Sequence, residues 1–119
     1  MSENIKEVLH KKNISLKKFN NFRINAKALN FYIPETINGF VDLLKYFEES
    51  RKKYFILGGG SNILFVDEIV ETPIIFTGFF SRIEIYSDGI LGYSGAKIID
   101  LIKYAYKNSL SGLEFLFGL

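Results

Sequence analysis

Three consecutive glycines at residues 58–60 directly follow the continuous apolar run of residues 54–57. Each glycine loses much chain entropy on folding, so a run of three needs a physical reason. Either the backbone takes positive φ in a tight turn, or another group approaches it more closely than a Cβ allows. Three glycines exceed what a plain turn requires, and Ser61 and Asn62 add a hydroxyl and an amide. The pattern favours a concave backbone site for a phosphate or diphosphate.

The glycine run matches neither of the two common phosphate-binding fingerprints. It has no Gly-Lys-Ser/Thr of a P-loop, and it lacks the spacing of the dinucleotide motif G-x-G-x-x-G. That second motif also needs a helix directly after it, whereas an apolar run follows here at residues 63–66. From the residues alone, an anion site and a simple mobile loop both stay open.

The elements before the glycines predict a βαβ unit. Residues 28–33 have the composition of a strand, which Pro34 ends. Thr36 is placed to cap a helix whose apolar stripe runs at three- and four-residue spacing. The stripe consists of Ile37, Phe40, Val41, Leu44 and Phe47. Residues 54–57 form the second strand, which we expect to be parallel to the first.

After the glycines the pattern predicts a buried strand at residues 73–77, a hairpin and a helix. Residues 82–86 alternate, with Ile83 and Ile85 expected to point inward. Asp88-Gly89 marks the hairpin turn, and residues 90–94 form the returning strand. Residues 98–108 are expected to form an amphipathic helix.

The start of the chain is expected to be helical. Ser2 can cap residues 2–12, in which Ile5, Val8 and Leu9 form a stripe. A basic and aromatic stretch follows at residues 11–23. Such a stretch suits either nucleic acid or a solvated face with a few buried anchors, and its irregular spacing favours the second.

Composition removes several function classes. The chain has no Cys and one His, which excludes disulfides and thiolate metal sites and leaves little for a His-based metal site or triad. A net charge of +2 argues for neither nucleic acid nor a membrane as partner. The start lacks the pattern of a secretory signal, and no apolar run approaches the roughly 20 residues of a membrane helix. We expect a cytoplasmic protein without a metal site.

Three ordered motifs resemble the family of UDP-N-acetylenolpyruvoylglucosamine reductases. Residues 56–65 resemble that family's flavin-binding loop, and residues 20–24 resemble its Asn-Thr-Phe element, with Asn21 in place of the usual Thr. Residues 94–96 and 110–116 resemble the stretch that leads to its Gly-Ile-Pro-Gly turn. The resemblance covers nearly the whole chain from Leu16 onward.

The resemblance implies an α+β chain carrying an incomplete FAD-binding fold of the vanillyl-alcohol oxidase and p-cresol methylhydroxylase type. It implies FAD as cofactor, NADPH as hydride donor and a UDP-sugar substrate in peptidoglycan precursor synthesis. By carry-over, the FAD diphosphate would be held by Gly58, Gly59, Gly60, Ser61 and Asn62. Residues 1–24 would be a helix and lead-in, and residues 25–119 the first part of the FAD-binding domain.

The chain departs from the family pattern in ways that limit this expectation. Residues 67–71 keep the Asp that follows the loop but lack its glycines, and Ser109 replaces a common Gly. The family's catalytic Arg, Ser and Glu would lie beyond Leu119, so no catalytic residue is assigned, and Gly95, Ala96 and Gly118 are only candidate flavin contacts. Because the chain stops at an apolar residue, we expect a cut through a structural element, with a buried terminal strand as the alternative.

These observations leave three interpretations. The chain is part of the reductase, or a non-catalytic truncated remnant of it, or an unrelated phosphate-binding or interaction module. The order of the motifs favours the first two. In either case we expect this chain alone to be inactive.

Overall fold

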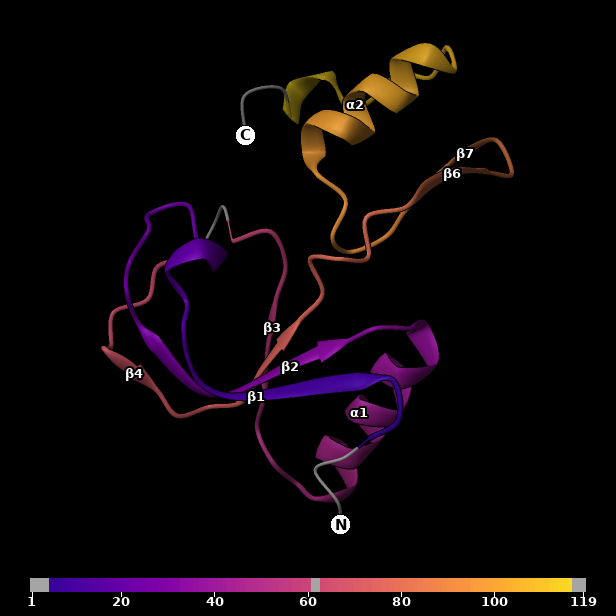
Figure 1. Cartoon of the computed structure of the whole chain (residues 1–119). Helices are drawn as coiled ribbons and strands as arrows, with labels where there is room; N and C mark the ends of the chain where they lie inside the picture. Colours follow the sequence, from indigo (N-terminus) through magenta and orange to yellow (C-terminus); the bar gives the residue numbers. More distant parts are fainter. Residues whose placement is uncertain (1–4, 61–62, 117–119) are drawn as a thin grey trace. The chain divides into compact units, whose positions relative to one another are not determined.

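The computed structural model describes residues 5–60 and 63–116, which divide into two compact units, residues 1–77 and 78–119. Figure 1 shows the elements of both units, coloured in sequence order from the N-terminus to the C-terminus. The first unit contains the strands β1 (Val8–Ser15), β2 (Lys27–Pro34), β3 (Phe55–Leu57), β4 (Ile69–Val70) and β5 (Ile74–Phe76), with the helix α1 (Ile37–Glu49) and a 3-10 turn at Lys17–Phe19. The second contains β6 (Ile83–Tyr86), β7 (Gly89–Gly92), α2 (Ile98–Lys107) and a 3-10 turn at Glu114–Leu116.

The strands of the first unit form one mixed sheet in the order β1-β2-β5-β3, with β4 also paired to β2. β2 and β3 are both parallel to β5, so the strands joined through α1 run in the same direction. The expected βαβ unit is therefore confirmed. The sequence did not predict one detail of this sheet. The strand β5, which comes later in the chain, lies between β2 and β3.

The two faces of the sheet bury different residues because side chains alternate along each strand. One face carries Phe31, Ile74 and Phe76, and Leu16 and Phe19 from the segment before β2 pack on it. The other face carries Tyr32 and Ile75, on which Leu43 and Phe47 of α1 pack. Figure 1 shows α1 along one side of the strands. The sheet is thus covered by a helix on one face and by irregular chain on the other.

Thr36 caps α1 as expected, because its Oγ1 accepts a hydrogen bond of 3.0 Å from the amide of Gly39. The expected buried stripe of the helix is wrong in part. Ile37 and Val41 are exposed, whereas Leu43 and Tyr46 are buried with Phe47. The apolar spacing identified a helix, but the position of the sheet determined which face it buries.

The helix expected at residues 2–12 is wrong within the described residues, since Val8–Ser15 is strand β1. It pairs antiparallel with β2 from Val8 opposite Pro34 to Ser15 opposite Lys27. Residues 5–24 therefore belong to the same compact unit as the sheet instead of forming a separate helical lead-in. The assignment of residues 25–119 to an FAD-binding domain stays a prediction.

The expected hairpin is present, but its turn lies one residue earlier than expected. Tyr86 pairs with Gly89, so the two turn residues are Ser87, at φ 56°, and Asp88. Ile85 is exposed, so the inward orientation expected for it is wrong. The expected helix at residues 98–108 is confirmed as α2.

The second unit buries little apolar surface among its described residues. Ala105 is the one hydrophobic residue there that is fully buried, whereas Phe79, Tyr106 and Phe115 are largely exposed. A unit of this size rarely gains enough stability from its own core. The exposed apolar side chains of this unit can therefore pack against a further apolar surface.

Candidate functional site

The glycine run begins where β3 ends, at the carboxyl end of an edge strand. It lines a hollow of about 240 Å³ together with the three residues of β3 and Ile63. Gly58 is half-buried, Gly59 is exposed and Gly60 is buried. Ser61 and Asn62, the other two predicted cofactor contacts, lie outside the described residues. The hollow is therefore built, as far as it is described, from backbone and apolar side chains.

Residue 60 must be glycine because of its backbone conformation and its close contacts. Its φ is +79°, and a Cβ on it would lie 2.1 Å from the carbonyl oxygen of Phe19 and 2.9 Å from the Cα of Asn20. Its own carbonyl accepts a hydrogen bond of 3.0 Å from the amide of Asn21. Gly60 is thus fixed by the fold.

Gly59 differs from Gly60 in each of these respects. A Cβ built on it would meet no atom of the chain within 4 Å, and its φ is not positive. Among the described residues, the amide groups of Gly58, Gly59 and Gly60 donate no backbone hydrogen bond. Free amides beside open space are what an anion needs to approach a backbone closely. Among the described residues, nothing in contact with residue 59 requires it to be glycine.

The structure brings two of the sequence motifs together at Gly60. Residues 20–24 and the glycine run are about 40 residues apart in sequence, yet the segment from Phe19 to Asn21 contacts Gly60 through its backbone. Sequence reasoning identified both motifs but not this contact. A resemblance gives the order of motifs, whereas their packing depends on the sheet between them.

Asn20 holds this segment in shape. Its side chain is 5% exposed, and its Nδ2 donates to the carbonyls of Leu16 at 2.8 Å and Ile24 at 3.1 Å. Its Oδ1 accepts from the amide of Ile24 at 3.0 Å. A buried amide with three hydrogen bonds closes the turn that presents Phe19 and Asn21 to Gly60. Asn20 therefore positions the glycine loop, and its role is structural.

A larger hollow of about 580 Å³ lies next to the glycine hollow and shares Phe55 and Ile63 with it. Its lining is mostly apolar, with Leu64 and Val66 exposed, and Lys52, Lys53, Glu48 and Asp67 also line it. Tyr54 lines it too and donates a hydrogen bond of 3.2 Å to Glu48. Desolvation, followed by this carboxylate, raises the pKa of Tyr54 above its ordinary value. We place the candidate site at the smaller hollow because that one has the open backbone amides.

The motif residues of the second unit are held within that unit. Gly95 donates its amide to the carbonyl of Phe80 at 2.7 Å, and Ala96 donates to Tyr93 at 2.9 Å. These bonds close the chain at the base of the hairpin. The third candidate flavin contact, Gly118, lies outside the described residues.

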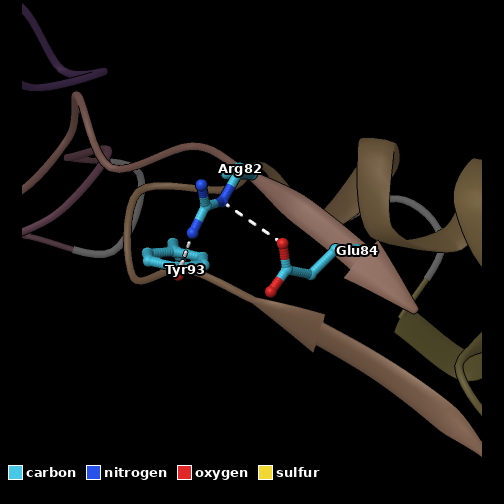
Figure 2. A network of polar contacts seen from close by, with 3 residues as sticks. All are labelled: Arg82, Glu84 and Tyr93. Atoms are coloured by element: carbon cyan, nitrogen blue, oxygen red, sulfur yellow. Dashed lines mark hydrogen bonds and ion pairs between the residues drawn. The ribbon is translucent and has the colours of Figure 1, made fainter. Parts of the chain in front are cut away.

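The most prominent polar cluster of the second unit is structural. Figure 2 shows Arg82 between the ring of Tyr93 and the carboxylate of Glu84. Its guanidinium lies 4.6 Å from the Tyr93 ring centre and donates to the phenol, and its Nε is 3.4 Å from the Glu84 carboxylate. The bond to Tyr93 and then the charge of Glu84 raise the pKa of Arg82. The arrangement joins the two ends of the hairpin.

Two further features of the described residues bear on function. No group of three or more His, Asp or Glu side chains there could hold a metal ion. Among the same residues, no helix is both long enough and apolar enough to cross a membrane.

A comparison with solved structures defines the class of fold. The chain superposes on CrmK, a flavoenzyme involved in the shunt product recycling mechanism in caerulomycin biosynthesis, with a TM-score of 0.64 and 17% identity. The match covers 87% of this chain and 22% of CrmK. The fold is therefore part of a flavoenzyme fold, as expected from the sequence.

Sequence comparison then identifies the family. The chain is 40% identical over 125 aligned positions to a UDP-N-acetylenolpyruvoylglucosamine reductase of Borreliella burgdorferi, covering all of this chain and 41% of the relative. It is 34% identical over 109 positions to the enzyme of that name from Listeria innocua, covering 92% of this chain and 37% of the relative. The chain is thus homologous over its length to an N-terminal part of the UDP-N-acetylenolpyruvoylglucosamine reductases. No family model matches it.

Two consequences follow from these matches. The expected family is confirmed, and the interpretation as an unrelated phosphate-binding module is wrong. The chain spans about two-fifths of the length of the curated relatives that it matches, 41% and 37% in the two cases above.

Proposed function

We propose that this chain is the part of a UDP-N-acetylenolpyruvoylglucosamine reductase that binds the diphosphate of FAD. The observation that carries the proposal is the contrast between two neighbouring glycines. Gly60 is required by the fold, whereas Gly59 is exposed beside open space, and among the described residues the amides of the glycine run donate no backbone hydrogen bond. The flavoenzyme fold and the reductase relatives supply the kind of ligand that such a loop would hold.

The residues present fit this cofactor. The hollow of about 240 Å³ has backbone donors and no acidic side chain in its described lining. A doubly charged diphosphate loses water on binding, and fixed amide donors replace it. Gly58, Gly59 and Gly60 would hold the diphosphate, and we extend the role to Ser61 and Asn62 from the resemblance. Bound FAD supplies hydride transfer, and this chain's residues bind and orient it.

For the whole enzyme we propose reduction of UDP-N-acetylglucosamine enolpyruvate to UDP-N-acetylmuramate, with NADPH as hydride donor. This reaction belongs to peptidoglycan precursor synthesis, and the proposal includes a cytoplasmic location with neither nucleic acid nor a membrane as partner. No described residue is assigned a catalytic role, and we expect the chain alone to turn over no substrate. Catalysis would need residues from the larger part of the enzyme.

A cofactor titration tests the proposal. The purified chain is titrated with FAD, and binding is followed through flavin fluorescence and the visible spectrum. We expect Gly59→Val to lose FAD binding while its circular dichroism and melting temperature stay unchanged, because the new side chain meets no atom of the described chain. Gly89→Val is the matched control, since the nearest atom to its Cβ is 3.9 Å away in the hairpin.

Two results would refute the proposal. One is an unaltered, folded chain that binds no FAD. The other is a Gly59→Val variant that retains FAD with the affinity of the unaltered chain, because a branched side chain at the presumed diphosphate site must obstruct it.

A further inference from the structure

The glycine loop contains only neutral donors, although a diphosphate carries about two negative charges. The described lining of the hollow consists of glycines and of Phe55, Ile56, Leu57 and Ile63. Amide dipoles replace part of the lost hydration, but a nearby opposite charge lowers the free energy of the bound anion further. The question is which side chains supply that charge.

The segment that holds Gly60 is a source of positive charge beside the glycine loop. The Cα of Asn20 lies 2.9 Å from the Cβ position of Gly60. Consecutive Cα atoms are about 3.8 Å apart, so the Cα of Lys18 lies within about 11 Å of that position. The amide of Arg23 donates to the carbonyl of Asn20 at 3.1 Å, which closes a turn whose ends are less than about 7 Å apart. Lys18 and Arg23 thus flank the backbone that touches the glycine loop.

The side chains of Lys18 and Arg23 are both accessible to a bound anion. Lys18 and Arg23 are exposed, and neither forms an ion pair with another described residue. The Lys18 ammonium lies 5.6 Å from the ring centre of Phe19, the residue whose carbonyl abuts Gly60. Its charge is therefore kept close to the segment and is not neutralised there.

No acidic residue lies near these two cations in the sequence. No Asp or Glu occurs between Glu7 and Glu35, or between Lys53 and Asp67. Acidic residues follow at Asp67 and Glu68, where the Glu68 carbonyl accepts a bond from Lys27 at the far end of the segment. One part of the basic stretch, Phe19 to Asn21, thus lies against the candidate phosphate loop.

We propose that Lys18 and Arg23 supply the countercharge for the diphosphate held at the glycine loop, which makes flavin affinity dependent on ionic strength. The inference rests on the proposed function. For an assumed charge separation of about 10 Å in water, each cation attracts a doubly charged group with an energy that salt screens over a Debye length. Removal of both charges is expected to weaken FAD binding about 3-fold at 0.1 M salt and about 7-fold at 0.01 M.

The test compares two double variants of the full chain. Lys18→Gln/Arg23→Gln removes the two proposed charges, and Lys11→Gln/Lys45→Gln removes two exposed charges from β1 and α1. The dissociation constants of FAD and of riboflavin, which has no phosphate, are measured at both salt concentrations. We expect the first variant alone to lose FAD affinity, with a larger loss at low salt and no change for riboflavin. Lys18→Arg/Arg23→Lys, which keeps both charges, should bind FAD like the unaltered chain.

Each other outcome overturns a different statement. Equal losses in the two charge variants, or a loss that does not depend on salt, would refute the role of Lys18 and Arg23 while the flavin site stands. A matching loss for riboflavin would show that the substitutions act through the fold, which also refutes it. An unaltered chain that binds no FAD would refute the proposed function itself, and this inference with it.

Discussion

Replacing Gly60 by alanine should destabilise the first unit, whereas the same change at Gly59 should not. A methyl group on Gly60 would lie 2.1 Å from one backbone atom and 2.9 Å from two others, so no side-chain rotation can relieve the overlap. Its φ of +79° adds the cost of a left-handed conformation, roughly 1–2 kcal/mol for a residue with a Cβ.

Relief of that overlap requires the segment around Asn20 to move away. The movement would break the bond from the Asn21 amide to the Gly60 carbonyl, with a net contribution of about 0.5–1.5 kcal/mol. Together with the strain, we expect Gly60→Ala to lose about 1.5–3.5 kcal/mol of unfolding free energy. Gly59→Ala has open space and no positive φ, so we expect a change between zero and a gain of about 1 kcal/mol.

Two measurements check this pair of variants. Urea unfolding followed by circular dichroism gives the free energy, and hydrogen exchange of the Asn21 amide reports the local bond. In Gly60→Ala the midpoint should fall and the Asn21 amide should exchange faster. Equal stability of the two variants, or unchanged protection of Asn21 in Gly60→Ala, would refute the argument that Gly60 is fixed by the fold.

Three further outcomes follow from other parts of the first unit. Asn20→Ala should lose about 2–4 kcal/mol in urea unfolding, because it removes three hydrogen bonds to the backbone of Leu16 and Ile24, and an unaltered midpoint would contradict the role of its side chain. Thr36→Ala should lose about 1 kcal/mol and Thr36→Ser much less, since the serine hydroxyl can still cap α1; equal losses would exclude the cap. The pKa of Tyr54 is raised from 10.0, so its contribution to stability is present below about pH 10 and is lost as the pH rises through the higher folded value. Tyr54→Phe should therefore reduce the drop in melting temperature above about pH 10, and an identical pH profile would show that Tyr54 makes no such contribution.

The phosphate-binding role of the glycine run stays a prediction, and the sequence did not distinguish the individual glycines within that run. Sequence reasoning treated the three glycines as one phosphate-binding run. The structure separates Gly60, which packs against the backbone of Phe19 and Asn20, from Gly59, which packs against nothing described. That distinction depends on a contact between segments about 40 residues apart, and no local pattern encodes it.

The error at the start of the chain has a similar cause. Residues 5–12 include residues with helical spacing, yet β1 pairs with β2 along almost its whole length. Propensity is a weak prior, and the hydrogen bonds of a ladder with a buried partner override it. The partner strand β2 was predicted correctly, but nothing in the residues before it states that they pair with it.

The sequence by itself determined the secondary-structure elements that depend on local sequence signals, and it determined the protein family. Thr36 and the apolar spacing after it are enough for α1, and the ordered motifs are enough for the reductase family. The Asp88-Gly89 dipeptide predicted the hairpin, although its turn is Ser87-Asp88. The tertiary structure alone decided that β5 lies between β2 and β3 and that residues 20–24 meet the glycine loop. Local patterns fix what a segment can become, whereas pairing between distant segments depends on which surfaces remain to be buried once the whole sheet has formed.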